Sequence, residues 1–195
     1  MRVKSRWNVK GKDRSLAETG GALAFIMWRI AQNGVLHLEN EGFQIDTYNQ
    51  RLDVLAEFLA FLFHYTDRSV SEKLDAEGRE ELMTALARRL ADNMQENRVD
   101  SEGQKDYRGE FISLLNRRTD DYAEFSLYEG EPGFAFRRYL GEKVTSVMGP
   151  QDSKWISDQM MDIEVPAAIK PLNKALGDLI AQANSGPGED GPLSA

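Results

Sequence analysis

The chain has 195 residues, of which 41% are hydrophobic and 29% charged, and it contains no cysteine. This length suits one well-filled core, and the composition is that of a soluble globular chain rather than a disordered one. The lack of cysteine excludes disulfide bridges, thiolate zinc sites and cysteine nucleophiles, and a net charge of −8 argues against broad binding to nucleic-acid phosphates.

Positive charge is concentrated in residues 1–14, which hold six basic residues and one acidic residue and therefore carry +5. Because the whole chain carries −8, the remaining residues carry −13. We predict that residues 1–14 form a flexible basic arm. Residues 185–195 contain repeated glycine and proline and are predicted to form a disordered tail. Residues 15–184 between them are expected to form one helical domain.

A first helix is predicted to begin after Ser15, because the sequence Ser15–Glu18 is a capping box. Its apolar residues then recur at helical spacing. Gly20 and Gly21 lie in its second turn, where glycine lowers helix stability but permits close approach of another backbone. Residues 35–45 have two interpretations. The apolar spacing favours a continued helix, and the alternative is a short hairpin that turns near residues 40–42.

Residues 46–67 are predicted to form the central helix of a bundle. They include residues 52–65, the most apolar stretch of the chain, whose apolar side chains fall into two adjacent stripes at helical spacing. An apolar face this wide cannot be covered from one side, so other elements must pack around most of the helix. Asp46 or Thr47 can cap its N-terminus.

Three more helices are predicted in the middle of the chain. The first begins near Ser71 or Asp75 and has one apolar and one charged side. The second follows a polar loop at residues 97–105. The glycines and proline of residues 130–133 separate it from the third, with the proline near the start of that helix.

The last portion of the helical domain is less regular. Asp152 or Ser153 can cap a short helix, and Pro166 and Pro171 bracket the start of a final one. Sustained strand-like alternation is not seen outside the ambiguous segment described above. The predicted fold class is therefore all-α: a single-domain bundle of about six helices around the central helix 46–67.

The sequence lacks the motifs of the common enzyme classes. His37 and His64 are its only histidines, and neither lies in a Glu-x-x-His or His-Glu-x-x-His pattern. A nucleophile elbow, a Walker A loop and a dinucleotide fingerprint are also missing. We therefore assign no catalytic residue, metal or cofactor, and we favour a non-enzymatic role while leaving catalysis open.

One line of polar residues on the central helix could still carry chemistry. Asp53, Glu57 and His64 share a face, since they are spaced i, i+4 and i+11. If enclosed, they could bind a metal or pass a proton, with Arg29 of the first helix as the counter-ion of Glu57. We favour simpler interpretations, namely a narrow solvent-facing stripe or a structural Arg29–Glu57 ion pair.

Three helices each carry a pair of adjacent arginines. Adjacent residues of a helix point about 100° apart, so at most one arginine of each pair can face a shared site. Three guanidinium groups could hold a phosphate or carboxylate ligand, and the alternative function is therefore a small-molecule-binding protein or an enzyme with an anionic ligand. Surface ion pairs with nearby acids are the favoured interpretation of the arginines. The residues are Arg88, Arg89, Arg117, Arg118, Arg137 and Arg138.

Aromatic residues cluster between residues 125 and 139, on both sides of the glycine-proline break. Most are expected in the core, but some can be exposed near the break, and exposed aromatic residues beside arginines are favoured at protein interfaces. The leading hypothesis is therefore an interaction protein that binds a protein partner, including a second copy of itself as a homodimer. A secretory signal and a membrane span are not recognisable, so a cytoplasmic location is expected.

Overall fold

The computed structural model describes residues 15–149 and 153–184, so the predicted arm 1–14 and tail 185–195 lie outside the described residues. The predicted all-α class is confirmed, because the described chain is almost entirely helical. No helix within these ranges is both long and apolar enough to cross a membrane. The elements are α1 (Leu16–Asn40), α2 (Tyr48–Val70), α3 (Ala76–Glu102), α4 (Tyr107–Ala123), β1 (Leu127–Tyr128), β2 (Glu131–Pro132), α5 (Phe134–Met148), α6 (Ser153–Gln159), the π-helix η1 (Met160–Glu164) and α7 (Val165–Asn184).

Side-chain caps set the starts of the first two helices. The Ser15 hydroxyl accepts a hydrogen bond from the Glu18 N–H (3.1 Å), and the Glu18 carboxylate accepts one from the Ser15 N–H (3.3 Å), which confirms the capping box. Thr47 caps α2 by accepting from the Gln50 N–H at 3.0 Å. Because α1 continues to Asn40, the helical interpretation of this region holds to that residue and the alternative hairpin is not formed.

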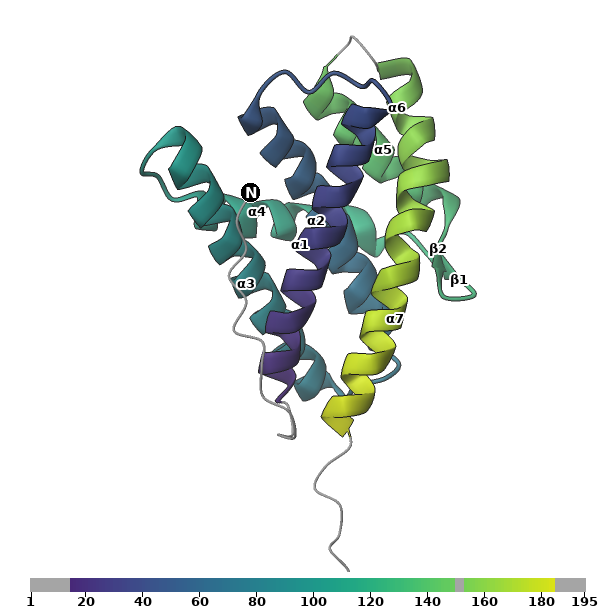
Figure 1. Cartoon of the computed structure of the whole chain (residues 1–195). Coiled ribbons are helices and arrows are strands. Elements are labelled where there is room, and N and C mark those ends of the chain that lie inside the picture. The colour runs from purple at the N-terminus through teal and green to yellow at the C-terminus, as the bar shows by residue number, and fades with distance from the viewer. Residues whose placement is uncertain (1–14, 150–152, 185–195) are drawn as a thin grey trace, which may run out of the picture.

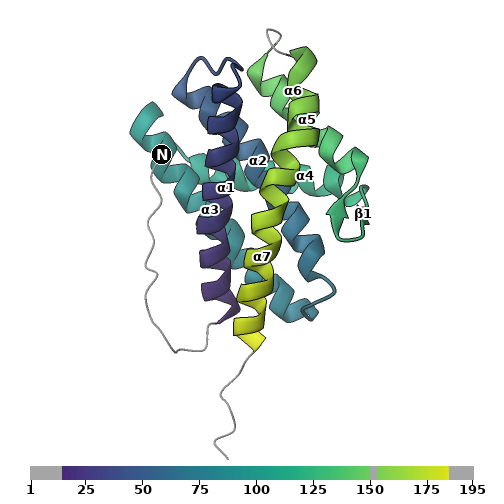
Figure 2. The same cartoon turned by 45° about the vertical axis from the view of Figure 1, so that its right-hand side comes forward.

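The helix α2 lies at the centre of the bundle, as predicted. It packs against α1, α3, α4 and α5, and every residue from 54 to 62 is buried. The helices α1 and α7 lie side by side and antiparallel in both overall views, and α3 packs on the other side of α1 (Figures 1 and 2). The start of α1 and the end of α7 therefore lie at the same end of the molecule.

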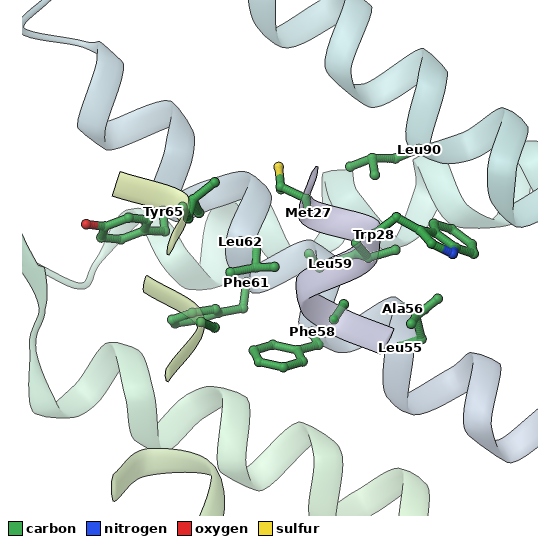
Figure 3. Packing of buried hydrophobic residues seen from close by; sticks show 14 of the residues in the cluster. Met27, Trp28, Leu55, Ala56, Phe58, Leu59, Phe61, Leu62, Tyr65 and Leu90 are labelled. Carbon is green, nitrogen blue, oxygen red and sulfur yellow. The ribbon is translucent and has the colours of Figure 1, made fainter. Parts of the chain in front are cut away.

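The core is built on the two apolar stripes of α2. Figure 3 shows Leu55 and Leu59 of α2 in the same part of the core as Trp28 of α1, and all three side chains are buried. On the other side of α2, the Phe61 ring meets Phe136 of α5 edge to face, with 5.2 Å between ring centroids. The wide apolar face is thus covered from several sides, which is the physical reason for its central position.

One glycine of α1 permits a close helix contact. A Cβ atom placed on Gly20 would lie 2.8 Å from the Leu82 carbonyl oxygen and 2.9 Å from the Leu86 nitrogen, both in the backbone of α3. A Cβ atom on the adjacent Gly21 would meet nothing within 4 Å. Of the two glycines in this turn, Gly20 therefore allows α1 and α3 to approach each other.

These neighbours give a matched pair of variants. Alanine in place of either glycine adds about 1 kcal/mol of helix propensity, so Gly21→Ala should raise the free energy of unfolding. In Gly20→Ala the same gain is opposed by displacement of the α3 backbone, at a cost of about 1–3 kcal/mol. Urea unfolding should therefore find Gly20→Ala less stable than Gly21→Ala by this amount. Equal free energies of unfolding for the two variants would show that the α3 backbone can move away from residue 20 without loss of stability.

The C-terminal helices differ from the predicted arrangement. Pro166 and Pro171 do not separate two helices, because α6, η1 and α7 follow one another without interruption and Pro171 lies inside α7. The described residues thus form six helical rods if these three elements are counted as one. The π-helical turn η1 immediately precedes α7, and Pro166 is the second residue of α7.

Candidate functional site

A short hairpin interrupts the helices between α4 and α5 and projects from the side of the bundle (Figure 1). Its strands are antiparallel and pair Tyr128 with Glu131. The two loop residues, Glu129 and Gly130, both have positive φ, 53° and 80°, which is the requirement of a type I′ turn. The sequence prediction of a simple break at this point missed the hairpin, although the glycine in its turn was recognised.

The C-terminal half of α2 anchors this hairpin. The Tyr65 hydroxyl lies 2.7 Å from the Gly130 carbonyl and 2.7 Å from Oδ1 of Asn173 in α7. One turn away, the Arg68 guanidinium donates to the Tyr122 and Ala123 carbonyls at 2.6 Å, at the end of α4. A buried phenol and a guanidinium therefore satisfy backbone groups of the turn and of the preceding helix end.

A pocket of about 300 Å³ lies where the hairpin meets α5 and α7. Two of its lining residues carry aromatic rings that are largely in solvent: Tyr128 is 69% exposed and Phe134 is 59% exposed. Large aromatic side chains are mostly buried in single domains, so two exposed rings at one pocket are unusual. We call this surface the hairpin site; its residues are Tyr128, Glu131, Pro132, Gly133, Phe134, Arg137, Val165 and Pro166.

Arg137 is the cation of the hairpin site. Its Nη1 donates to the Met161 carbonyl at 3.3 Å, and its Nε is buried without a hydrogen-bond partner. The Met161 carbonyl is available because of the π-helical turn: the Val165 N–H already bonds the Met160 carbonyl, and the next donor in that pattern would be Pro166, which has no N–H. The Nη groups of the guanidinium carry more N–H donors than this one bond uses, and they can bind a further partner.

The six paired arginines do not form one pocket. Among them only Arg137 lines the hairpin site. Arg118 binds Glu57 in the interior, and Arg138 forms a surface ion pair with Glu142 at 2.9 Å. Because these side chains have separate partners, the described residues do not bring the three pairs to a shared anion site. The remaining three are half-buried or exposed on α3 and α4: Arg88, Arg89 and Arg117.

The predicted partner of Glu57 was wrong. Both carboxylate oxygens of Glu57 accept hydrogen bonds from Arg118 of α4, at 2.9 and 2.6 Å. Arg29 instead is exposed, with its guanidinium 6.0 Å from the centroid of the Phe25 ring on its own helix. Glu57 is only 6% exposed, so the expected structural ion pair exists with a different arginine.

The other members of the polar line also have separate partners. Asp53 binds Arg98 of α3, while a ring nitrogen of His64 lies 3.2 Å from the Leu115 carbonyl of α4. The described residues contain no group of three His, Asp or Glu side chains placed to hold a metal. The line thus joins α2 to two neighbouring helices through different contacts.

Burial controls the protonation of the groups around Glu57. Burial lowers the pKa of His64 to about 4, which keeps its ring neutral at pH 7. Burial also raises the pKa of Tyr122 far above its ordinary value, and the Tyr122 hydroxyl has no hydrogen-bond partner. The pKa of Tyr139 is raised by burial and by its hydrogen bond to Asp121. Neutral phenols and a neutral imidazole offer no base or acid poised near neutral pH, so we interpret this cluster as structural.

A second buried carboxylate lies in η1 and was missed by sequence reasoning. Glu164 is 3% exposed, and its Oε1 lies 2.6 Å from Nδ1 of His37 in α1. Gln159 donates to the same oxygen at 3.0 Å, and the second nitrogen of His37 lies 3.6 Å from Glu41. The Glu164 contact raises the pKa of His37. The two residues are 127 positions apart, so no local pattern pointed to the pair.

Comparison with known proteins identifies no relative. The chain matches no protein-family model, no curated protein and no solved structure at a significant level. The functional argument therefore depends on the geometry of the sites described above.

Proposed function

We propose that this chain is an interaction protein that self-associates through the hairpin site. The observation that carries the proposal is the pair of exposed rings, Tyr128 and Phe134, on the walls of one pocket that also contains Arg137. Tyrosine and arginine are enriched among the residues that dominate binding energy at protein interfaces. Burial of two aromatic side chains would supply apolar contact area that the isolated chain leaves in water.

The charges of the site favour a second copy of the chain as the partner. Arg137 and Glu131 both line the pocket, yet no ion pair joins them within the described ranges. In a two-fold symmetric dimer, each residue of one subunit can meet the other residue on its partner. Arg137 of one subunit would then bind Glu131 of the other, twice, with the aromatic rings between. A surface with both charges is thus complementary to itself.

Sedimentation measurements at several concentrations test the proposal. The hairpin alone is smaller than the ~800 Å² per partner of a standard interface, so we expect a weak dimer that dissociates within ~1–200 µM. The double variant Tyr128→Ser/Phe134→Ser should be monomeric throughout this range. The matched control is Leu36→Ser, which removes a 54% exposed apolar side chain on α1 and should leave the dimer intact.

Charge exchange tests the arrangement within the dimer. Arg137→Glu and Glu131→Arg should each be monomeric, because each places like charges opposite one another. An equimolar mixture of the two variants should form a dimer, since each then meets its complement across the interface. A wild-type monomer at the highest concentration would refute self-association. A mixture that stays monomeric beside a wild-type dimer would refute the Arg137–Glu131 pairing.

A further inference from the structure

The pair formed by His37 and Glu164 is connected to the hairpin site through the chain, because Glu164 ends η1 immediately before α7. Glu164 follows Met161, whose carbonyl holds Arg137, by three residues, and it immediately precedes Val165 and Pro166 of the pocket wall. The π-helical turn η1 also packs against α5, which carries Arg137. A contact that fixes the position of Glu164 therefore also fixes Val165 and Pro166 of the pocket and the Met161 carbonyl that binds Arg137.

The contact that holds Glu164 depends on a proton. A protonated His37 gives the buried carboxylate both a hydrogen bond and a compensating charge, and charge-assisted hydrogen bonds are about twice as strong as neutral ones. Loss of that proton leaves Glu164, 3% exposed, with neutral donors only, and a buried carboxylate without a counter-charge is strongly disfavoured. The charged groups that face His37 are Glu164 of η1 and Glu41 of α1.

The direction of the pH effect follows from these two carboxylates. Both raise the pKa of His37. A group whose pKa is raised on folding contributes stability that is complete below its unfolded pKa, near 6.5, and that is lost as the pH rises through the raised value. The contact between α1 and η1 should therefore weaken as the pH rises above 6.5 through the raised pKa of His37.

We propose that His37 and Glu164 form a proton-dependent latch that holds η1 and the pocket wall in place, so that the hairpin site binds more tightly when His37 is protonated. This regulation rests on the function proposed above. The latch itself, however, concerns a segment of the monomer. It can be measured whether or not the chain dimerises.

Hydrogen exchange of the intact protein tests the latch. Protection factors, which correct for the intrinsic effect of pH on exchange, are compared for residues 160–165 at about pH 6 and about pH 9, on either side of the histidine range. In the wild type we expect protection to fall by about threefold to tenfold as the pH rises. In His37→Gln, which keeps a donor without the titration, protection should be independent of pH and low. The buried segment 54–62 of α2 serves as the internal reference, and Glu41→Gln as the matched control should retain most of the response.

A second measurement separates the latch from the proposed function. The dimer dissociation constant is determined at the same two pH values, and it should rise with pH in the wild type and not in His37→Gln. The latch is refuted if the protection factors of the wild type do not change with pH. It is also refuted if they change by the same amount in His37→Gln. A pH-dependent exchange in a chain that never dimerises supports the latch and overturns self-association. If exchange of the η1 segment depends on pH but the dimer dissociation constant does not, the latch does not control dimerisation.

Discussion

Arg118→Met is expected to lower the free energy of unfolding by about 3–5 kcal/mol, the range found when one partner of a buried ion pair is removed. The reason is the position of Glu57, which is 6% exposed and accepts from Arg118 with both of its oxygens. Methionine fills much of the volume of arginine but leaves the carboxylate without charge compensation. For a chain of this size the melting temperature should fall by roughly 2–4 °C for each kcal/mol.

The neighbouring Arg117 provides the matched control. It lies on the same helix but is exposed, so Arg117→Met should change the stability by less than about 0.5 kcal/mol. Glu57→Met/Arg118→Met should recover much of the loss, because replacement of a buried ion pair by apolar residues of similar volume is often nearly neutral. Equal stability of Arg117→Met and Arg118→Met in urea unfolding would contradict the structural role of the pair.

The same ion pair shows what periodicity can and cannot predict. The spacing of Asp53, Glu57 and His64 placed them on one face of a helix, which holds for any α-helix. The choice of partner depends on which helix packs on that face. That depends on contacts between residues far apart in the chain, and here α4 rather than α1 supplies the arginine. A single helical pattern contains no information about its neighbour, so Arg29 could not be distinguished from Arg118.

The apolar pattern of α2 was more informative because its consequence is independent of topology. A helix that is apolar around most of its circumference must be enclosed, whichever elements enclose it. The hairpin, by contrast, has strands of two residues each, too short for any alternation to be visible. Its turn depends on a positive φ at Glu129, which glutamate rarely adopts. The contacts of Tyr65 and Arg68, which hold the hairpin, are again between distant segments.

The aromatic cluster between residues 125 and 139 shows an intermediate case. Its composition suggested that some rings would be exposed near the glycine-proline break, and Tyr128 and Phe134 are. Which rings these are follows from the hairpin and from the start of α5, since Phe136, two residues further, is fully buried against Phe61. The composition thus predicted that exposed aromatic residues lie near the break, but the backbone structure was needed to identify them as Tyr128 and Phe134.

Acid is expected to destabilise the protein through His64. The folded pKa of His64 is lowered to about 4 by burial, against 6.5 for the unfolded chain. Between these values the unfolded chain binds a proton that the folded chain excludes, so stability is complete above 6.5 and is lost as the pH falls toward 4. By pH 4.5 the loss should reach about 2–3 kcal/mol. His37 acts in the opposite sense, because its raised pKa removes stability as the pH increases.

His64→Gln isolates this contribution, because glutamine can still donate to the Leu115 carbonyl but does not titrate. All other ionisable groups are common to both proteins, so their contributions cancel in the comparison. Urea unfolding at pH 7.5 and pH 4.5 should therefore show a fall that is smaller in the variant by about 2–3 kcal/mol. His37→Gln should lose at least as much stability in acid as the wild type, because it keeps His64 and lacks the opposing contribution of His37. The opposite outcome is an equal loss of stability in acid for His64→Gln and the wild type. The His64 ring would then accept a proton while it stays in the core. The cluster around Glu57 would in that case hold a buried positive charge at His64, contrary to the lowered pKa.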